Sequence, residues 1–298
     1  MLRSRPNPVD VPTGVCRSSR RSRCARYRWG FTLIELLIAV MITSMLSVVL
    51  GALTFAVHRA WEYTTGHEEA HLQGAAAIDR ICYMVSQAGT YKTPDGPTTL
   101  GVRTLDVTRA GIEFPQMLVV WSGGRDGGMA ANGTLDRLPR IDELVVYAPD
   151  LNDPASLVEY TVPSDNSTID FNGADFDTRI AGLAGDLGLQ TTVLCDRLRR
   201  SVLERDASSV VHTIGNVRFA IESFPTDDEL ASAAPGSDAW NALIWPQGAV
   251  STSAGLRQMN LRIELQVETN RDNVDFNGSS TTSIPRFGSA SVRYAYQP

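Results

Sequence analysis

The chain reads Gly30-Phe31-Thr32-Leu33-Ile34-Glu35-Leu36-Leu37-Ile38-Ala39-Val40 at the start of an apolar run that continues to Val57. Glu35 is the only charged residue between Phe31 and Val57. A helix of this length rises about 40 Å, and the hydrocarbon core of a bilayer is about 30 Å thick. We therefore expect residues 31–57 to span a membrane with some tilt.

Glu35 is not explained by membrane anchoring alone. A carboxylate at the centre of a lone membrane helix costs at least ~2–3 kcal/mol, and less near an interface. No Lys or Arg lies within the apolar run to neutralise it. The sequence therefore predicts that Glu35 serves a purpose other than membrane insertion.

Charge is distributed unevenly along the 298 residues. Residues 1–30 contain eight Arg and one Asp, a net of +7, so the remainder of a chain with net charge −6 carries −6 − 7 = −13. A basic flank before an apolar span predicts a cytoplasmic N-terminus in a single-pass inner-membrane protein, with the C-terminal domain periplasmic or otherwise extracytoplasmic. The acidity of that domain argues against a nucleic-acid partner.

The motif Gly30-Phe31-Thr32-Leu33-Ile34-Glu35, between a basic segment and an apolar helix, resembles the N-terminal signature of type IV prepilins and type II secretion pseudopilins. The resemblance implies that a prepilin peptidase removes residues 1–30 as a cytoplasmic leader by cutting between Gly30 and Phe31. It further implies that Phe31 becomes the N-methylated terminus. Glu35 would then attract the terminal amine of a neighbouring subunit during assembly.

A long helix followed by strands is the pattern of the rest of the chain. Ile78, Ile81, Cys82 and Val85 have the spacing of one helix face, so we expect residues 58–89 to be the amphipathic half of a helix that begins at Phe31, with Gly89 as its C-cap. Residues 90–298 alternate between polar linkers and segments with period-two patterns, which predicts an α+β, pilin-like fold with an antiparallel sheet packed on the helix. The expected strands are Leu100–Val107, Met117–Trp121, Glu143–Ala148, Ser156–Val162, Thr191–Leu198, Asn216–Phe224, Gln258–Glu268 and Ser289–Tyr296.

Four cysteines are present, of which Cys16 and Cys24 would leave with the leader. Cys82 and Cys195 would remain on the oxidising side of the membrane, where a disulfide between them would close a long loop. The alternative is that both are small buried apolar side chains.

Two patterns suggest metal binding, although neither is complete. His67-Glu68-Glu69-Ala70-His71 has the spacing of a zinc protease helix, but Ala77 stands where a third ligand is expected; a solvated helix face is the alternative. Oxygen-rich loops at Asp170 and Asp175, and at Asp275 and Asn277, resemble parts of calcium loops or ordinary turns. We expect no catalytic residues and no obligatory cofactor, with calcium as the weaker alternative.

A finer resemblance links the chain to the J-type minor pseudopilin of type II secretion and to the PilW-type minor pilin. It rests on short segments spread along the chain: Ala76-Ile78-Arg80, Leu157-Val158-Glu159-Tyr160, Leu194-Cys195-Asp196-Arg197-Leu198, Val217–Phe224, and Trp240 and Trp245-Pro246 shortly before Leu256–Val267. It implies a structural subunit at or near a pseudopilus tip that helps initiate assembly and secretion, with other minor pseudopilins or pilins as partners. The alternatives are a PilW-type minor pilin for pilus biogenesis and a membrane-tethered metal enzyme that uses His67, Glu68 and His71.

Overall fold

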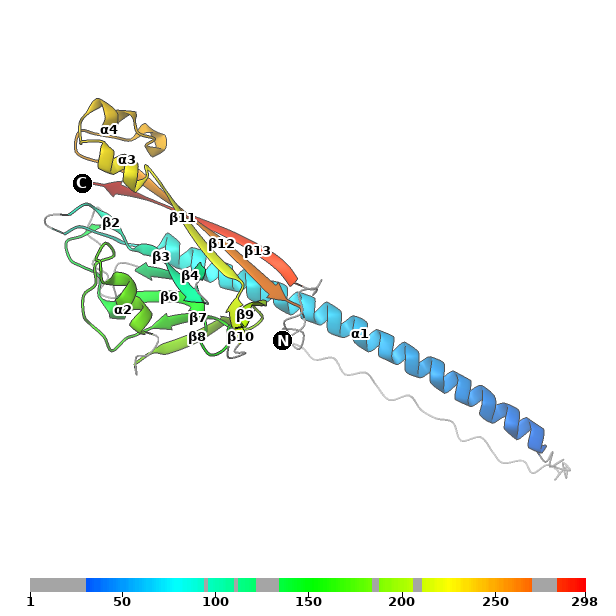
Figure 1. Cartoon of the computed structure of the whole chain (residues 1–298). Coiled ribbons are helices and arrows are strands. Elements are labelled where there is room, and N and C mark those ends of the chain that lie inside the picture. Colours follow the sequence, from blue (N-terminus) through cyan, green and yellow to red (C-terminus); the bar gives the residue numbers. More distant parts are fainter. Residues whose placement is uncertain are drawn as a thin grey trace, which may run out of the picture. The chain divides into compact units, whose positions relative to one another are not determined.

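The computed structural model describes residues 31–93, 96–109, 112–121, 134–183, 188–205, 211–269 and 283–298. The chain divides into two units, Met1–Ala56 and Val57–Pro298. A single helix, α1 (Leu33–Ser86), begins in the first unit and ends in the second (Figure 1). The prediction of one long helix is thus confirmed.

The end of α1 differs from the prediction. The helix stops at Ser86, and Gly89 does not cap it: its amide donates to the carbonyl of Trp121 at 2.9 Å. Gly89 thereby leads the chain into the short strand β1 (Thr90–Tyr91). The turn after α1 is fixed by strand pairing instead of by a left-handed glycine.

The larger sheet of the second unit has five antiparallel strands in the order β3-β4-β6-β7-β8. Their bounds are β3 Val102–Arg109, β4 Ile112–Trp121, β6 Leu144–Pro149, β7 Leu157–Thr161 and β8 Gln190–Cys195. Each overlaps a strand expected from period-two patterning.

A second sheet contains three antiparallel strands in the order β11-β12-β13, so the strands expected in a single sheet are divided between separate sheets. Its strands are β11 Val217–Phe224, β12 Gly255–Glu268 and β13 Ser283–Tyr296. A hairpin of β9 (Arg200–Arg205) and β10 (Val211–Gly215) was not expected.

The expectation of purely antiparallel pairing is wrong at one small sheet. Strand β1 pairs antiparallel with β2 (Thr99–Leu100) but parallel with β5 (Thr134–Leu135). Two-residue strands such as these carry no periodicity, because alternation needs at least four positions to be recognised.

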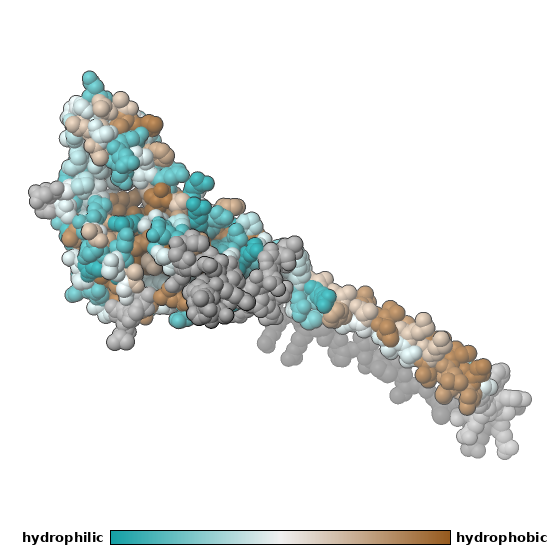
Figure 2. All heavy atoms as spheres, in the orientation of Figure 1, coloured by the Kyte–Doolittle hydropathy of each residue, from teal (hydrophilic) through white to brown (hydrophobic). Residues whose placement is uncertain are grey.

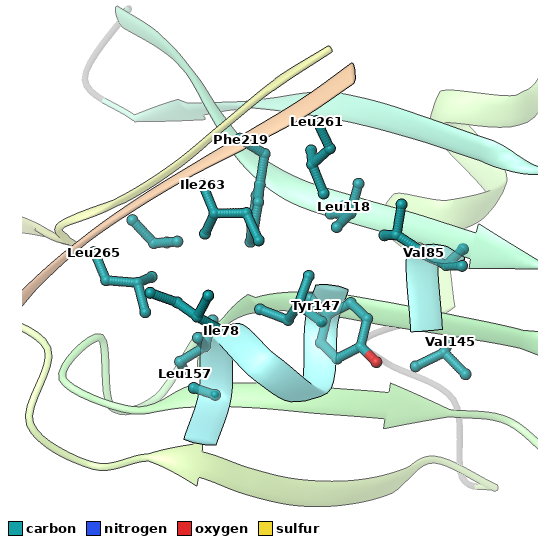
Figure 3. Close-up of a cluster of buried hydrophobic side chains, with 14 of the residues drawn as sticks. Ile78, Val85, Leu118, Val145, Tyr147, Leu157, Phe219, Leu261, Ile263 and Leu265 are labelled. Carbon is teal, nitrogen blue, oxygen red and sulfur yellow. The ribbon is translucent and has the colours of Figure 1, made fainter. Parts of the chain in front are cut away.

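The main core forms where the amphipathic half of α1 packs against both sheets (Figure 3). Ile81 and Val85 are fully buried. Side chains from the five-stranded sheet, such as Leu118 and Tyr147, and from the three-stranded sheet, such as Phe219, converge on the helix. The predicted stripe is therefore the centre of the core, except that Cys82 is only half-buried at its margin.

Two smaller clusters complete the second unit. One lies between the five-stranded sheet and α2 (Phe176–Leu183), with η1 (Ile141–Glu143) beside it. There the buried carboxylate of Glu143 accepts a hydrogen bond from the Trp121 indole at 2.9 Å. The other is a lobe between β11 and β12 that contains α3 (Asp227–Ser232), α4 (Asp238–Ala242) and η2 (Pro246–Gly248).

Candidate functional site

The apolar half of α1 is exposed on every side in the structure. All residues from Phe31 to Val57 are solvent-exposed, and the most apolar stretch of the helix contains no buried residue. The visible face of this half is coloured mostly brown to white, from hydrophobic to intermediate (Figure 2). By length and composition, α1 is a helix that could cross a membrane or act as a signal anchor.

Glu35 takes part in the cap at the beginning of this helix. Its Oε2 accepts hydrogen bonds from the amide and the hydroxyl of Thr32, both at 2.9 Å. The Glu35 amide in turn donates to the Thr32 hydroxyl at 3.4 Å. This reciprocal arrangement is a capping box, which satisfies amide groups that the first helical turn leaves without partners.

Thr32 was not expected from the sequence as a partner of Glu35. The signal was present, because Thr32-Leu33-Ile34-Glu35 matches the spacing of a capping box before an apolar run. Glu35 therefore has a hydrogen-bonding role within its own chain. That role does not require a negative charge, because Gln also serves at this position of the box.

The structure describes only the C-terminal side of the predicted cleavage junction. Phe31 precedes the helix with 84% of its surface exposed, whereas Gly30 and the leader, with Cys16 and Cys24, lie outside the described residues. Cleavage and N-methylation at Phe31 remain predictions.

The two remaining cysteines are free thiols, so the disulfide considered from the sequence is absent. The Cys82 thiol on α1 donates to the carbonyl of Ser289 on β13 at 3.6 Å. Cys195 ends β8 in the other sheet, buried in the main core. Burial raises the pKa of the Cys195 thiol to about 11 and, together with Asp79, raises that of Cys82. Their positions fit the alternative of apolar packing residues.

The zinc-like motif lies on α1 within the second unit. His67 is half-buried with its Nδ1 unpartnered, whereas Glu68 and His71 are exposed. Neighbouring Glu69 forms an ion pair with Arg197. Within the described part of the chain, no group of three or more His, Cys, Asp or Glu side chains is placed to hold a metal ion.

The first of the two calcium-like loops is described, and its carboxylates have structural partners. Asp170 Oδ1 accepts hydrogen bonds from the Tyr91 hydroxyl at 2.6 Å and from the Asn172 amide at 2.9 Å. Asp175 is exposed immediately before α2. These contacts are those of a turn docked onto β1. Asp275 and Asn277 lie outside the described residues.

No family model, curated protein or solved structure matches this chain. The arguments for its function therefore come from its own residues and from the resemblance of its N-terminal motif.

Proposed function

We propose that the chain is a membrane-anchored structural subunit of a pilin-like filament. Within that class, a minor pseudopilin at or near the tip of a type II secretion pseudopilus is the function that fits best. One observation carries the proposal: a single helix joins an exposed apolar half, bearing one carboxylate, to an amphipathic half in the core of a β-rich domain. Such a helix presents a surface for lipid and for other helices while its far end belongs to the globular unit.

Cleavage would give Glu35 a cationic partner. The new α-amine of Phe31 has a reference pKa near 8, and a carboxyl group has one near 4.3, so both are charged at neutral pH. The capping box leaves the carboxylate near the helix start, where the amine of a neighbouring subunit can approach it. Neutralising one member of an ion pair in an apolar setting costs ~3–5 kcal/mol.

The leader is the first test of the proposal. Mass spectrometry of the chain purified from membranes of a host with active prepilin peptidase should show a mature N-terminus at N-methyl-Phe31. Gly30→Leu should leave the precursor uncut. Recovery of the intact leader from the unmodified chain would contradict the proposal.

The capping box makes the test of Glu35 sharper. Glu35→Gln keeps an acceptor for the Thr32 amide but removes the charge, whereas Thr32→Ala keeps the charge and removes the hydroxyl. We expect Glu35→Gln and Glu35→Ala to be inserted and cleaved normally but to lose co-purification with other prepilin-like subunits. Thr32→Ala should co-purify at close to the wild-type level.

The opposite pattern would assign Glu35 to helix capping alone. In that case Glu35→Gln would co-purify normally, and Thr32→Ala and Glu35→Ala would share any defect. The identity of the co-purified subunits would distinguish a secretion pseudopilus from a type IV pilus, which is the second candidate assembly.

A further inference from the structure

Strand β13 is a long strand at the margin of its sheet. It extends over 14 residues and pairs only with β12 within the part of the chain that the structure describes (Figure 1). Two contacts touch this edge: the Thr98 amide donates to the Gln297 carbonyl at 2.7 Å at its C-terminal end, and the Cys82 thiol of α1 donates to the Ser289 carbonyl at 3.6 Å near its middle. Natural proteins usually shorten, cover or charge such an edge, because its unpaired amides and carbonyls can bind another strand.

The register shows which residues of β13 face outward. The amide of Gln266 on β12 donates to Asn216, and its carbonyl accepts from Arg199, so both groups point away from β13. Gln266 is paired with Pro285. Because backbone direction alternates along an antiparallel ladder, Pro285 and every second residue after it direct their backbone groups to the free edge. These residues are Pro285, Phe287, Ser289, Ser291, Arg293 and Ala295.

An independent contact supports this assignment. The Ser289 carbonyl accepts the Cys82 thiol from α1 and is therefore directed away from β12. Pro285 has no amide to donate, and prolines in sheets occupy such outward positions. The backbone amides of Phe287, Ser291 and Arg293 have no hydrogen-bond partner among the described residues.

The charge of the edge favours one kind of occupant. Strand β13 carries Arg286 and Arg293 and no acidic residue, in a chain whose residues 31–298 have a net charge of −13. Among described residues neither guanidinium has a carboxylate within ion-pair distance. The Arg293 Nε donates to the Gln258 side-chain oxygen on β12 at 2.8 Å, and the buried Nε of Arg286 has no hydrogen-bond partner. Besides burial, the nearby negative charge of Asp79 on α1 raises the pKa of the Cys82 thiol, and Cys82 lies near the middle of the edge. The two arginines of β13 lie on either side of this negative charge, so the positive charge of the edge is toward its two ends.

The neighbouring face of α1 offers apolar contacts. Leu72 and Tyr83 are 69% and 59% exposed, and their spacing from Asp79 places them on one side of the helix. A second copy of β13 is a poor occupant of the edge, because it would bring four arginines together without a carboxylate. An extended segment with acidic ends and an uncharged middle would form hydrogen bonds with the outward backbone groups of β13 and ion pairs with its two arginines.

We propose that the edge of β13 from Phe287 to Ala295 binds an extended acidic segment of another protein as an added strand. Main-chain hydrogen bonds would supply affinity, and the arginines would select the partner. This inference rests on the second unit alone and does not depend on the proposed filament function.

The test uses the full chain in detergent micelles and two fluorescent peptides. One is acetyl-Glu-Glu-Val-Thr-Val-Thr-Val-Glu-Glu-amide, and the other replaces each Glu with Lys. We expect saturable binding of the Glu peptide, at least about 10-fold tighter than that of the Lys peptide. In the double variant Arg286→Glu and Arg293→Glu the preference should reverse. Equal binding of both peptides, or an unchanged preference in the double variant, would overturn the proposal.

A matched pair of variants tests the backbone contacts. Ser291→Pro removes one outward amide, whereas Ser291→Ala keeps it and removes only the hydroxyl. We expect an affinity loss of about 10-fold or more for proline and none for alanine; equal affinities would contradict strand addition.

Residue-resolved hydrogen exchange of the unmodified chain keeps the proposal testable if Ser291→Pro does not fold. The Glu peptide should protect the amides of Phe287, Ser291 and Arg293, while those of Gly288 and Val292 are already protected by β12. Protection elsewhere, or protection that rises with protein concentration in the absence of peptide, would overturn the assignment of the occupant.

Discussion

The two halves of α1 use apolar side chains for opposite purposes. Ile38, in the first half, is 52% exposed, whereas Ile81, in the second half, is fully buried between two sheets. Both belong to one continuous helix, so local helix propensity does not separate them. The difference shows that the fraction of the helix circumference that is apolar determines what the helix packs against. An all-round apolar surface suits lipid or other helices, and a single stripe suits a folded core.

Replacing isoleucine with aspartate, once in each half of α1, should give the largest effects on stability and on membrane insertion, and it compares the two halves most directly. Ile81→Asp places an unpaired carboxylate in the core and should lower the free energy of unfolding by roughly 3–5 kcal/mol. Ile38→Asp should leave unfolding of the second unit unchanged but oppose membrane insertion by about 2.5–3.5 kcal/mol. Denaturant titration and membrane fractionation measure the two effects. Equal losses of domain stability would show that the two halves do not differ in this way.

Glycines in the two halves offer a smaller and more specific test. A Cβ at Gly66 would lie under 3.0 Å from the Thr269 carbonyl oxygen, whereas a Cβ at Gly51 meets nothing within 4 Å. Gly66→Ala should therefore destabilise the second unit by about 1–3 kcal/mol. Gly51→Ala should increase helicity in micelles, with a gain of up to about 1 kcal/mol in helix propensity. A stabilising Gly66→Ala would show that helix and strand are less closely packed there.

The rates of cysteine alkylation give the smallest expected effect, and measuring them does not require a change in the stability of the protein. Cys82 is half-exposed at the margin of the buried stripe, and Cys195 is buried with a thiol pKa of about 11. Because the thiolate is the reactive form, alkylation at pH 8 should be slow at Cys82 and slower still at Cys195. A cysteine introduced by Ser47→Cys, in the exposed half, should react fastest in micelles that admit the reagent. Faster labelling of Cys195 than of Cys82 would contradict the burial described for the second half.

Sequence patterns predicted the long helix and most of the longer strands, although the hairpin of β9 and β10 was missed. The apolar run and the stripe at Ile78, Ile81 and Val85 located α1, and the alternation from Leu261 to Val267 located β12. The division of the strands into separate sheets was not predictable, because strand pairing depends on contacts distant in sequence, as between β4 and β6. The helices in the polar linkers were missed although Thr226 and Glu229 form a capping box at α3.

The isolated charge of Glu35 in an apolar run was visible in the sequence, and the assembly role of Glu35 stays a prediction. Its hydrogen bonds with Thr32 were not expected, because only a cationic partner was sought for the carboxylate. The role of β13 could not be read from the sequence. Which backbone groups face outward depends on the register with β12, and the neighbouring thiol of Cys82 comes from a residue more than two hundred positions earlier.

The lobe between β11 and β12 has a consequence for engineering the molecule. Its two ends meet where Phe224 pairs with Gln258, and its Trp240 and Trp245 form a small cluster against which Tyr296 of β13 packs. Arg257 holds it to the sheet through Asp227 at 2.8 Å and the Pro225 carbonyl at 2.9 Å. The lobe is therefore an exchangeable module: a short turn, a tag or a foreign domain with closely spaced ends could replace it while the register of the sheet is kept.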